Sequence, residues 1–146
     1  LYLERGIAVG LGTDGCASNN DLDLFQEMGL TALAQCTHPE YPASLSAVDM
    51  LLLATNEGAR ALGLEDRAGS LEAGKRADIV AVRTAGPHAL ALHDPYAFLV
   101  NGATGADVAW VMTDGTVRVE DGRLVNVNLE DLLASVRELS KAIGCC

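Results

Sequence analysis

The stretch IAVGLGTDGCASNN, residues 7–20, joins an apolar run to a single carboxylate. Residues 7–12 are apolar on both faces, which is typical of a buried parallel strand. Asp14 follows at the carboxyl end of this predicted strand, the edge at which α/β barrels hold their catalytic groups, and Gly15 permits a sharp turn there. A carboxylate in this place can bind a cation or accept a proton from metal-bound water, and it can equally begin an Asx turn. The pattern by itself leaves both interpretations open.

Two helices are predicted after this strand. Asn20 or Asp21 can cap a helix that continues to about Gln35. Its apolar residues along one side are Leu22, Phe25, Met28, Ala32 and Leu33. Ser46 can cap a second helix over residues 47–62, which a glycine ends. A strand followed by two helices is the organisation of an α/β fold.

The second half of the chain changes character. A buried-type strand is predicted at residues 77–83, and three short apolar runs follow at 108–112, 116–120 and 123–127. Asp-Gly pairs separate these three runs. Asp-Gly between apolar runs is a strong hairpin signal, because both turn positions need positive φ. We therefore predict a β-meander in this half.

A terminal helix is predicted after Asn128, which can act as its cap. Its apolar stripe consists of Leu129, Leu132, Leu133, Val136, Leu139 and Ile143. The chain is thus predicted to have three parts. These are an α/β part at residues 1–63, a β-rich part at 64–127, and a helix with its tail at 128–146.

The charge balance excludes several classes of partner. The chain carries 20 acidic and 10 basic residues, a formal net charge of −10, whereas a surface for nucleic acid or anionic membrane needs clustered lysine and arginine. No apolar run reaches the roughly 18 residues of a membrane span, and no leader pattern opens the chain. The four cysteines form no CxxC pair. We expect a cytoplasmic protein that binds neither nucleic acid nor membrane.

Two apparent motifs do not predict a site. GSLEAGKR, residues 69–76, lacks the Ser or Thr that ends a phosphate-binding loop, and it follows a helix and leads into a strand, the reverse of that loop's setting. The histidines, His38, His88 and His93, share no metal-ligand spacing. A solvated or structural role is therefore favoured for each of them.

Four stretches, taken in order, resemble the metal-dependent amidohydrolase superfamily. Residues 6–28 resemble its eighth barrel strand and loop, residues 51–82 a late helix and the return into a β-sandwich, residues 93–125 the sandwich strands, and the terminal helix matches as well. The likeness is closest to the methylthioadenosine/S-adenosylhomocysteine deaminases, with cytosine-deaminase-like and chlorohydrolase enzymes as relatives. It implies a (β/α)₈ TIM-like barrel with a small β-sandwich built from both chain ends. A barrel needs about 250 residues. We therefore expect this chain to be the last third only: the final strand and helices of an incomplete barrel, the C-terminal sandwich strands and a closing helix.

The resemblance assigns a role to Asp14. The superfamily's site combines histidines and a glutamate after earlier strands with an aspartate after strand eight, and only that aspartate has a counterpart here. Asp14 is then expected to ligate the metal, contact the substrate, accept the proton of the attacking water and help deliver it to the leaving amine. The expected metal is divalent, zinc with iron or nickel as alternatives, held by the complete enzyme and not by this chain alone. Ser18, Asn19 and Asn20 match the family's SNN stretch, where fixing the loop and capping the helix is favoured over touching substrate.

The implied reaction is hydrolytic deamination of an aminated purine, nucleoside or similar heterocycle. The Thr-Asp-Gly sequence around Asp14 favours the deaminases over the triazine chlorohydrolases, which tend to depart from it. An amidase or chlorohydrolase of the same superfamily and a non-catalytic truncated product are the alternatives. The isolated chain is expected to be inactive. Its expected partners are a small heterocyclic substrate, the missing N-terminal part of the barrel, and further copies of the chain, because a lone strand at 7–12 leaves unpaired edges.

Overall fold

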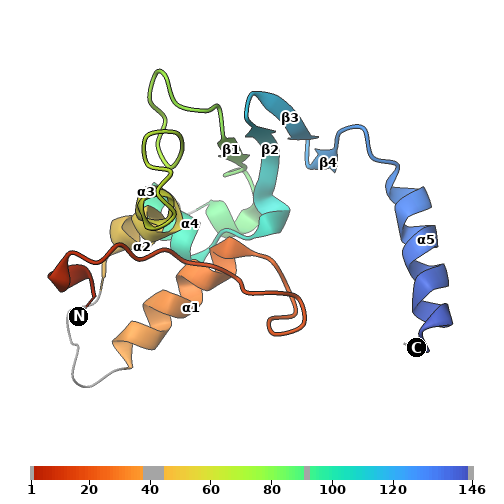
Figure 1. Ribbon diagram of the computed structural model, residues 1–146, viewed down its shortest axis with the longest axis horizontal. Coiled ribbons are helices and arrows are strands. Elements are labelled where there is room, and N and C mark those ends of the chain that lie inside the picture. Colours follow the sequence, from red (N-terminus) through yellow and green to blue (C-terminus); the bar gives the residue numbers. More distant parts are fainter. Residues whose placement is uncertain (1, 38–44, 91–92, 145–146) are drawn as a thin grey trace.

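The computed structural model describes residues 2–37, 45–90 and 93–144, in a mixed α/β arrangement (Figure 1). The helices are α1 (Leu24–Cys36), α2 (Ala47–Ala54), α3 (Asn56–Ala61), α4 (Pro95–Asn101) and α5 (Leu129–Ala142), with 3-10 turns at Leu3–Arg5, Pro87–Ala89 and Gly105–Asp107. The strands are β1 (Ile79–Val82), β2 (Val108–Thr113), β3 (Thr116–Glu120) and β4 (Arg123–Leu124). Two features of the sequence, His38 and the cysteine pair at 145–146, lie outside the described residues.

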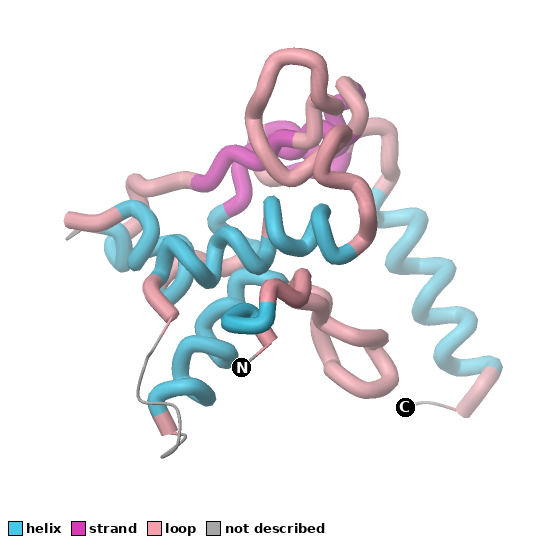
Figure 2. Tube along the Cα trace, turned by 60° about the vertical axis from the view of Figure 1, so that its left-hand side comes forward, coloured by secondary structure: helices cyan, strands magenta, loops and turns pink. Residues whose placement is uncertain are grey.

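The main core lies where α1, α2 and α4 meet. Its buried side chains are Met28, Met50, Leu53 and Val100, and Met50 has no exposed surface. Val9 and Leu11, from the segment before Asp14, pack against this cluster. Val100 belongs to α4, so a helix from the second half of the chain packs in the same core as α1 and α2. The strands gather on one side of these helices (Figure 2).

The predicted strand at residues 7–12 does not form in this chain. These residues are irregular, and the sheet of the described chain contains only β1 to β4. A parallel strand needs a neighbour about 4.8 Å away to satisfy its N–H and C=O groups. Here the segment runs across the helices instead (Figure 1). The Leu11 N–H donates to the carbonyl of Leu53 at 3.2 Å.

The first two predicted helices are present, with corrected boundaries. The first helix begins later than expected, because Asp23 and not Asn20 or Asp21 is its cap: the Asp23 carboxylate accepts the Phe25 N–H at 3.0 Å. Its other oxygen accepts the Gly105 N–H at 2.7 Å, a contact that sequence spacing does not reveal.

The Ser46 cap is confirmed. Ser46 and Asp49 form a reciprocal capping box at the start of α2. Hydrogen bonds from the hydroxyl and the backbone N–H of Ser46 hold the pKa of Asp49 below its usual range. The predicted helix over 47–62 is nevertheless split at Thr55, whose backbone lies at φ −127° and ψ −92°. Its hydroxyl donates to the Leu51 carbonyl at 2.7 Å, and such a bond back to residue i−4 often bends a helix.

The start of the stretch that resembles sandwich strands is a helix. Residues 95–101 form α4, because the Asp94 carboxylate accepts the Tyr96 N–H at 2.9 Å and Pro95 occupies the first turn, where it needs no N–H partner. The expectation of sandwich strands over all of residues 93–125 was therefore wrong at residues 95–101. The Asp-Pro pair at 94–95 was the sequence signal for the start of this helix. Phe98 and Val100 are its buried side chains.

The predicted meander is confirmed. The sheet is antiparallel in the order β1-β2-β3-β4. Both Asp-Gly turns have positive φ at both positions: 50° and 76° at Asp114 and Gly115, and 50° and 75° at Asp121 and Gly122. The third run is shorter than predicted, since β4 contains only Arg123 and Leu124.

The terminal helix α5 begins as predicted, because Asn128 accepts the N–H groups of Glu130 and Asp131 at 3.1 and 3.3 Å. It lies apart from the helical core (Figure 1), and none of its residues is buried. Its whole apolar stripe is exposed: Leu129, Leu132, Leu133, Val136, Leu139 and Ile143. Among the described residues, no helix is both long and apolar enough to span a membrane.

Candidate active site

Asp14 lies in the exposed loop that joins residues 7–12 to α1. Its backbone has φ 57°, in the left-handed region that residues other than glycine seldom occupy. Oδ1 of the carboxylate accepts the Gly15 N–H at 2.8 Å, and the Thr13 hydroxyl donates to the Asp14 carbonyl at 3.2 Å. No described residue donates a hydrogen bond to Oδ2. One carboxylate oxygen is therefore held by the turn, and the other is open to a ligand.

The loop after Asp14 is closed by hydrogen bonds to one carbonyl. The N–H groups of Ser18 and Asn19 both donate to the carbonyl of Gly15, each at 2.9 Å. The side chain of Asn19 donates to Oε1 of Glu27, on α1, at 2.6 Å. Asn20 is exposed. Within the SNN stretch, Asn19 thus has the loop-fixing contact.

The segment before Asp14 approaches α3 very closely. A Cβ atom added at Gly10 would lie 2.8 Å from the Cα of Gly58, a distance that real Cβ contacts essentially never show. Together with the hydrogen bond from the Leu11 N–H to the Leu53 carbonyl, this contact fixes where the segment before Asp14 lies on α2 and α3. Two facing glycines therefore permit the approach, because neither brings a side chain to it.

We expect Gly10→Ala to destabilise the chain by about 1–3 kcal/mol, the usual cost of forcing an extra methyl group into a packed contact. Gly12→Ala is the matched control, because a Cβ at Gly12 meets nothing within 4 Å. Its expected effect is within about 0.5 kcal/mol. Urea unfolding followed by circular dichroism measures both. Equal midpoints for the two variants would contradict the close approach.

Asp14 can be one ligand of a metal site but not the whole of one. The parts of the chain that the structure describes contain no group of three or more His, Cys, Asp or Glu side chains able to hold a metal ion. A zinc site needs three or four protein ligands. The open Oδ2 oxygen fits the donor type that divalent metals accept. The remaining ligands would have to come from outside these residues.

His88 has a structural contact. Its Nε2 lies 2.9 Å from Oδ1 of Asp107, and its ring lies 5.9 Å from that of Phe98. The Thr104 N–H, 2.9 Å from the same carboxylate, is the main cause that lowers the pKa of Asp107, and His88 adds to it. A hollow of about 350 Å³ beside this pair is lined by His88, His93, Asp94, Ala97, Phe98, Asn101 and Gly102. The pair ties two turns together, as the structural interpretation of His88 predicts.

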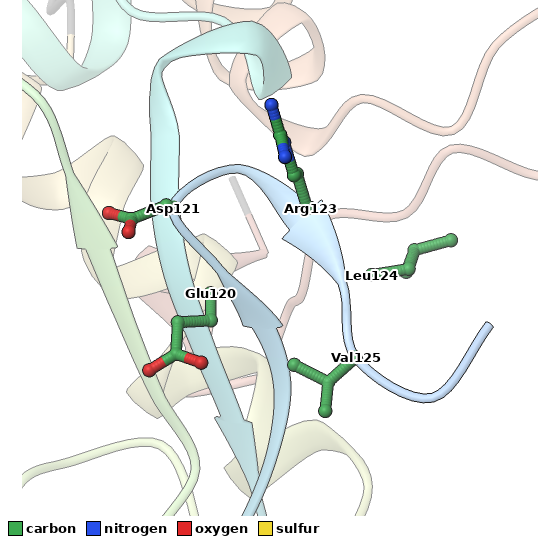
Figure 3. A pocket seen from close by; sticks show the side chains of 5 residues that line it. All are labelled: Glu120, Asp121, Arg123, Leu124 and Val125. Carbon is green, nitrogen blue, oxygen red and sulfur yellow. The ribbon is translucent and has the colours of Figure 1, made fainter. Parts of the chain in front are cut away.

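A larger hollow of about 600 Å³ lies at the β3–β4 hairpin (Figure 3). Its lining residues are Glu120, Asp121, Arg123, Leu124 and Val125. In Figure 3 the two carboxylates point away from the Arg123 guanidinium, so the polar groups do not converge on one point. A ligand site needs such convergence. This hollow is therefore not a second candidate site.

Residues 69–76 form a turn that leads into β1 and not a phosphate loop. Gly69 and Gly74 have φ of 90° and 98°. The Lys75 ammonium lies 2.7 Å from the Ser70 hydroxyl and 3.3 Å from the Glu72 carboxylate. The partners of this lysine are therefore side chains of the same turn. The hydrogen bond from the Ser70 hydroxyl is the main cause that lowers the pKa of Glu72, and Lys75 adds a smaller effect in the same direction.

Comparison with known proteins gives the family. Residues 1–118 match the model of the amidohydrolase family. The chain is 39% identical to the 5-methylthioadenosine/S-adenosylhomocysteine deaminase 1 of Syntrophus aciditrophicus, over 97% of this chain and 32% of that protein.

Solved structures share the fold, and two of them illustrate the likeness. The first is an adenosine deaminase from Xanthomonas campestris with bound zinc, with a TM-score of 0.91 and 35% identity over 99% of this chain and 33% of that one. The second is the atrazine chlorohydrolase of Arthrobacter aurescens complexed with zinc, with a TM-score of 0.80 and 38% identity over 94% of this chain and 31% of that one. The chain thus spans about a third of the length of these relatives, and it belongs to the amidohydrolase family.

Proposed function

We propose that this chain is part of a metal-dependent hydrolase that deaminates an aminated purine nucleoside or a similar heterocycle, with Asp14 as a catalytic residue. The observation that carries the proposal is the carboxylate of Asp14, which is held through one oxygen and open at the other. Family membership and the deaminase names of the relatives support the choice of reaction.

In this proposal Asp14 would be one of the residues that hold the metal, and it would contact the substrate and move a proton. Its open oxygen, Oδ2, accepts the proton of the water that attacks the ring carbon bearing the amino group. The same carboxylate then gives the proton to the amine, which leaves as ammonia. The hydrogen bond from the Gly15 N–H to Oδ1 favours one orientation of the carboxylate. A divalent metal supplies the complementary chemistry when bound, since zinc lowers the pKa of its water to about 7.

We further propose how the chain divides. Residues 1–63 are the end of a barrel, 64–127 the C-terminal strands of a composite sandwich, and 128–146 the closing helix and tail. The chain of the Xanthomonas campestris structure is about three times as long, and two thirds of it have no counterpart here. Such a segment, or a second copy, would cover the exposed stripe of α5.

Ammonia release tests the proposed function. We expect the complete, metal-loaded protein to release ammonia from adenosine, 5′-deoxyadenosine or methylthioadenosine, and the 146-residue chain alone to release none. A chlorinated triazine, assayed for chloride, tests the chlorohydrolase alternative that the second structural relative raises. Chloride without ammonia, no turnover by the complete protein, or turnover by this chain alone would each contradict the proposal.

A further inference from the structure

We propose that Glu27 and Asn19 are positioning residues for Asp14: they hold the turn at Gly15, whose N–H binds the Asp14 carboxylate. The inference rests on the proposed function of Asp14, and it adds two residues that act through the loop. It follows from a continuous series of hydrogen bonds between helix α1 and the carboxylate.

The series begins on the helix and ends at the carboxylate. Oε1 of Glu27 accepts the side-chain N–H of Asn19 at 2.6 Å, in a part-buried setting. The backbone N–H of Asn19 donates to the Gly15 carbonyl at 2.9 Å. The Gly15 N–H then donates to Oδ1 of Asp14 at 2.8 Å. Three successive contacts therefore link the helix to the carboxylate.

Glu27 stands on a rigid part of α1. The next residue, Met28, is 2% exposed and belongs to the main core. One turn earlier, Asp23 caps the helix and also accepts the Gly105 N–H at 2.7 Å. The anchor of the series is thus fixed on the core side and at the helix start.

Asp14 needs such an anchor. Its φ of 57° is a conformation that costs free energy in a residue other than glycine, and it persists only where the surroundings hold it. The loop from 12 to 23 is mostly exposed, and within it Asn19 reaches across to the helix. Without that contact only the backbone bonds of the turn would hold Gly15, and its N–H could move away from Oδ1 of Asp14.

Hydrogen exchange in the 146-residue chain tests the series directly. In Glu27→Leu we expect the amide protons of Ser18 and Asn19 to exchange faster, by about 2-fold to 10-fold, the effect of losing one net hydrogen bond. Glu27→Gln keeps an acceptor oxygen, and Asn20→Ala changes the exposed neighbour in the same stretch, so both should exchange like the parent chain. The amide of Met50, bonded to the Ser46 carbonyl, reports whether the core stays intact in each sample.

A second variant approaches the contact from the loop. Asn19→Ala should accelerate hydrogen exchange of the Ser18 amide as Glu27→Leu does. The double variant should give no further acceleration, because both changes remove the same interaction. Unchanged loop exchange in Glu27→Leu and in Asn19→Ala would overturn the proposal. So would an equal acceleration in Asn20→Ala.

Kinetics of the complete enzyme give the functional readout. Glu27→Leu should lower kcat by about 10-fold to 100-fold, as misplacement of a reacting group does. Glu27→Gln, which keeps an acceptor oxygen for Asn19, should restore kcat. If Asp14→Asn reduces turnover and Glu27→Leu does not, the positioning role alone fails. If Asp14→Asn has no effect, the proposed function fails, whatever the exchange rates are.

Discussion

Asp14→Asn is expected to lower kcat for ammonia release by the complete enzyme by about 10²-fold to 10⁴-fold, the usual contribution of a general acid–base residue. Asparagine has nearly the same shape, and its carbonyl oxygen can still accept the Gly15 N–H that holds Oδ1 in the parent chain. The substitution therefore removes the charge and the ability to take a proton while it leaves the turn in place. The loss belongs to the proton transfer and not to the fold.

Steady-state turnover and metal content per chain, measured together, check this result. Asp66→Asn is the matched control: it makes the same chemical change at an exposed position in the turn after α3, and it should leave kcat unchanged. Bound metal should fall as well if Asp14 is a ligand, whereas a residue that acts only as a base would leave it unchanged. Normal turnover in Asp14→Asn would remove Asp14 from the mechanism.

The second large effect is expected in the core. Leu53→Ala should reduce the free energy of unfolding by about 2–5 kcal/mol, the range for a leucine that leaves a cavity when truncated. Leu53 is 4% exposed and packs with Met28, Met50 and Val100. Because the Leu53 carbonyl also accepts the Leu11 N–H, the cavity should loosen the segment that leads to Asp14.

Leu52→Ala is the control for this prediction. Leu52 is the neighbouring residue on the same helix and is 42% exposed, so it carries the same change in helix propensity with far less burial. Urea unfolding, followed by circular dichroism at one protein concentration, should place its midpoint close to that of the parent chain. Equal losses in the two variants would mean that α2 does not face the core as the structure has it.

The sequence determined the features whose partners lie within a few residues. The Ser46 cap, the Asn128 cap and the two Asp-Gly turns each need only neighbours along the chain, and all are where the sequence predicts them. The family is also readable from the sequence, because the matching stretches keep their order over most of the chain.

Only the tertiary structure decided the features whose partners are distant in the chain. The cap of α1 is Asp23, whose second oxygen binds Gly105, and the segment before Asp14 is placed by the contact between Gly10 and Gly58. Asp94 and Pro95 were a local sequence signal for helix α4. No local signal indicated that this helix packs against Met28. The apolar run at 7–12 is suited to a parallel strand, yet strand hydrogen bonds need a second strand beside it, and none of the described residues supplies one. The sequence therefore identified Asp14 as a candidate. Its one held and one open oxygen became visible only in three dimensions, because side-chain hydrogen bonds depend on how the backbone is placed.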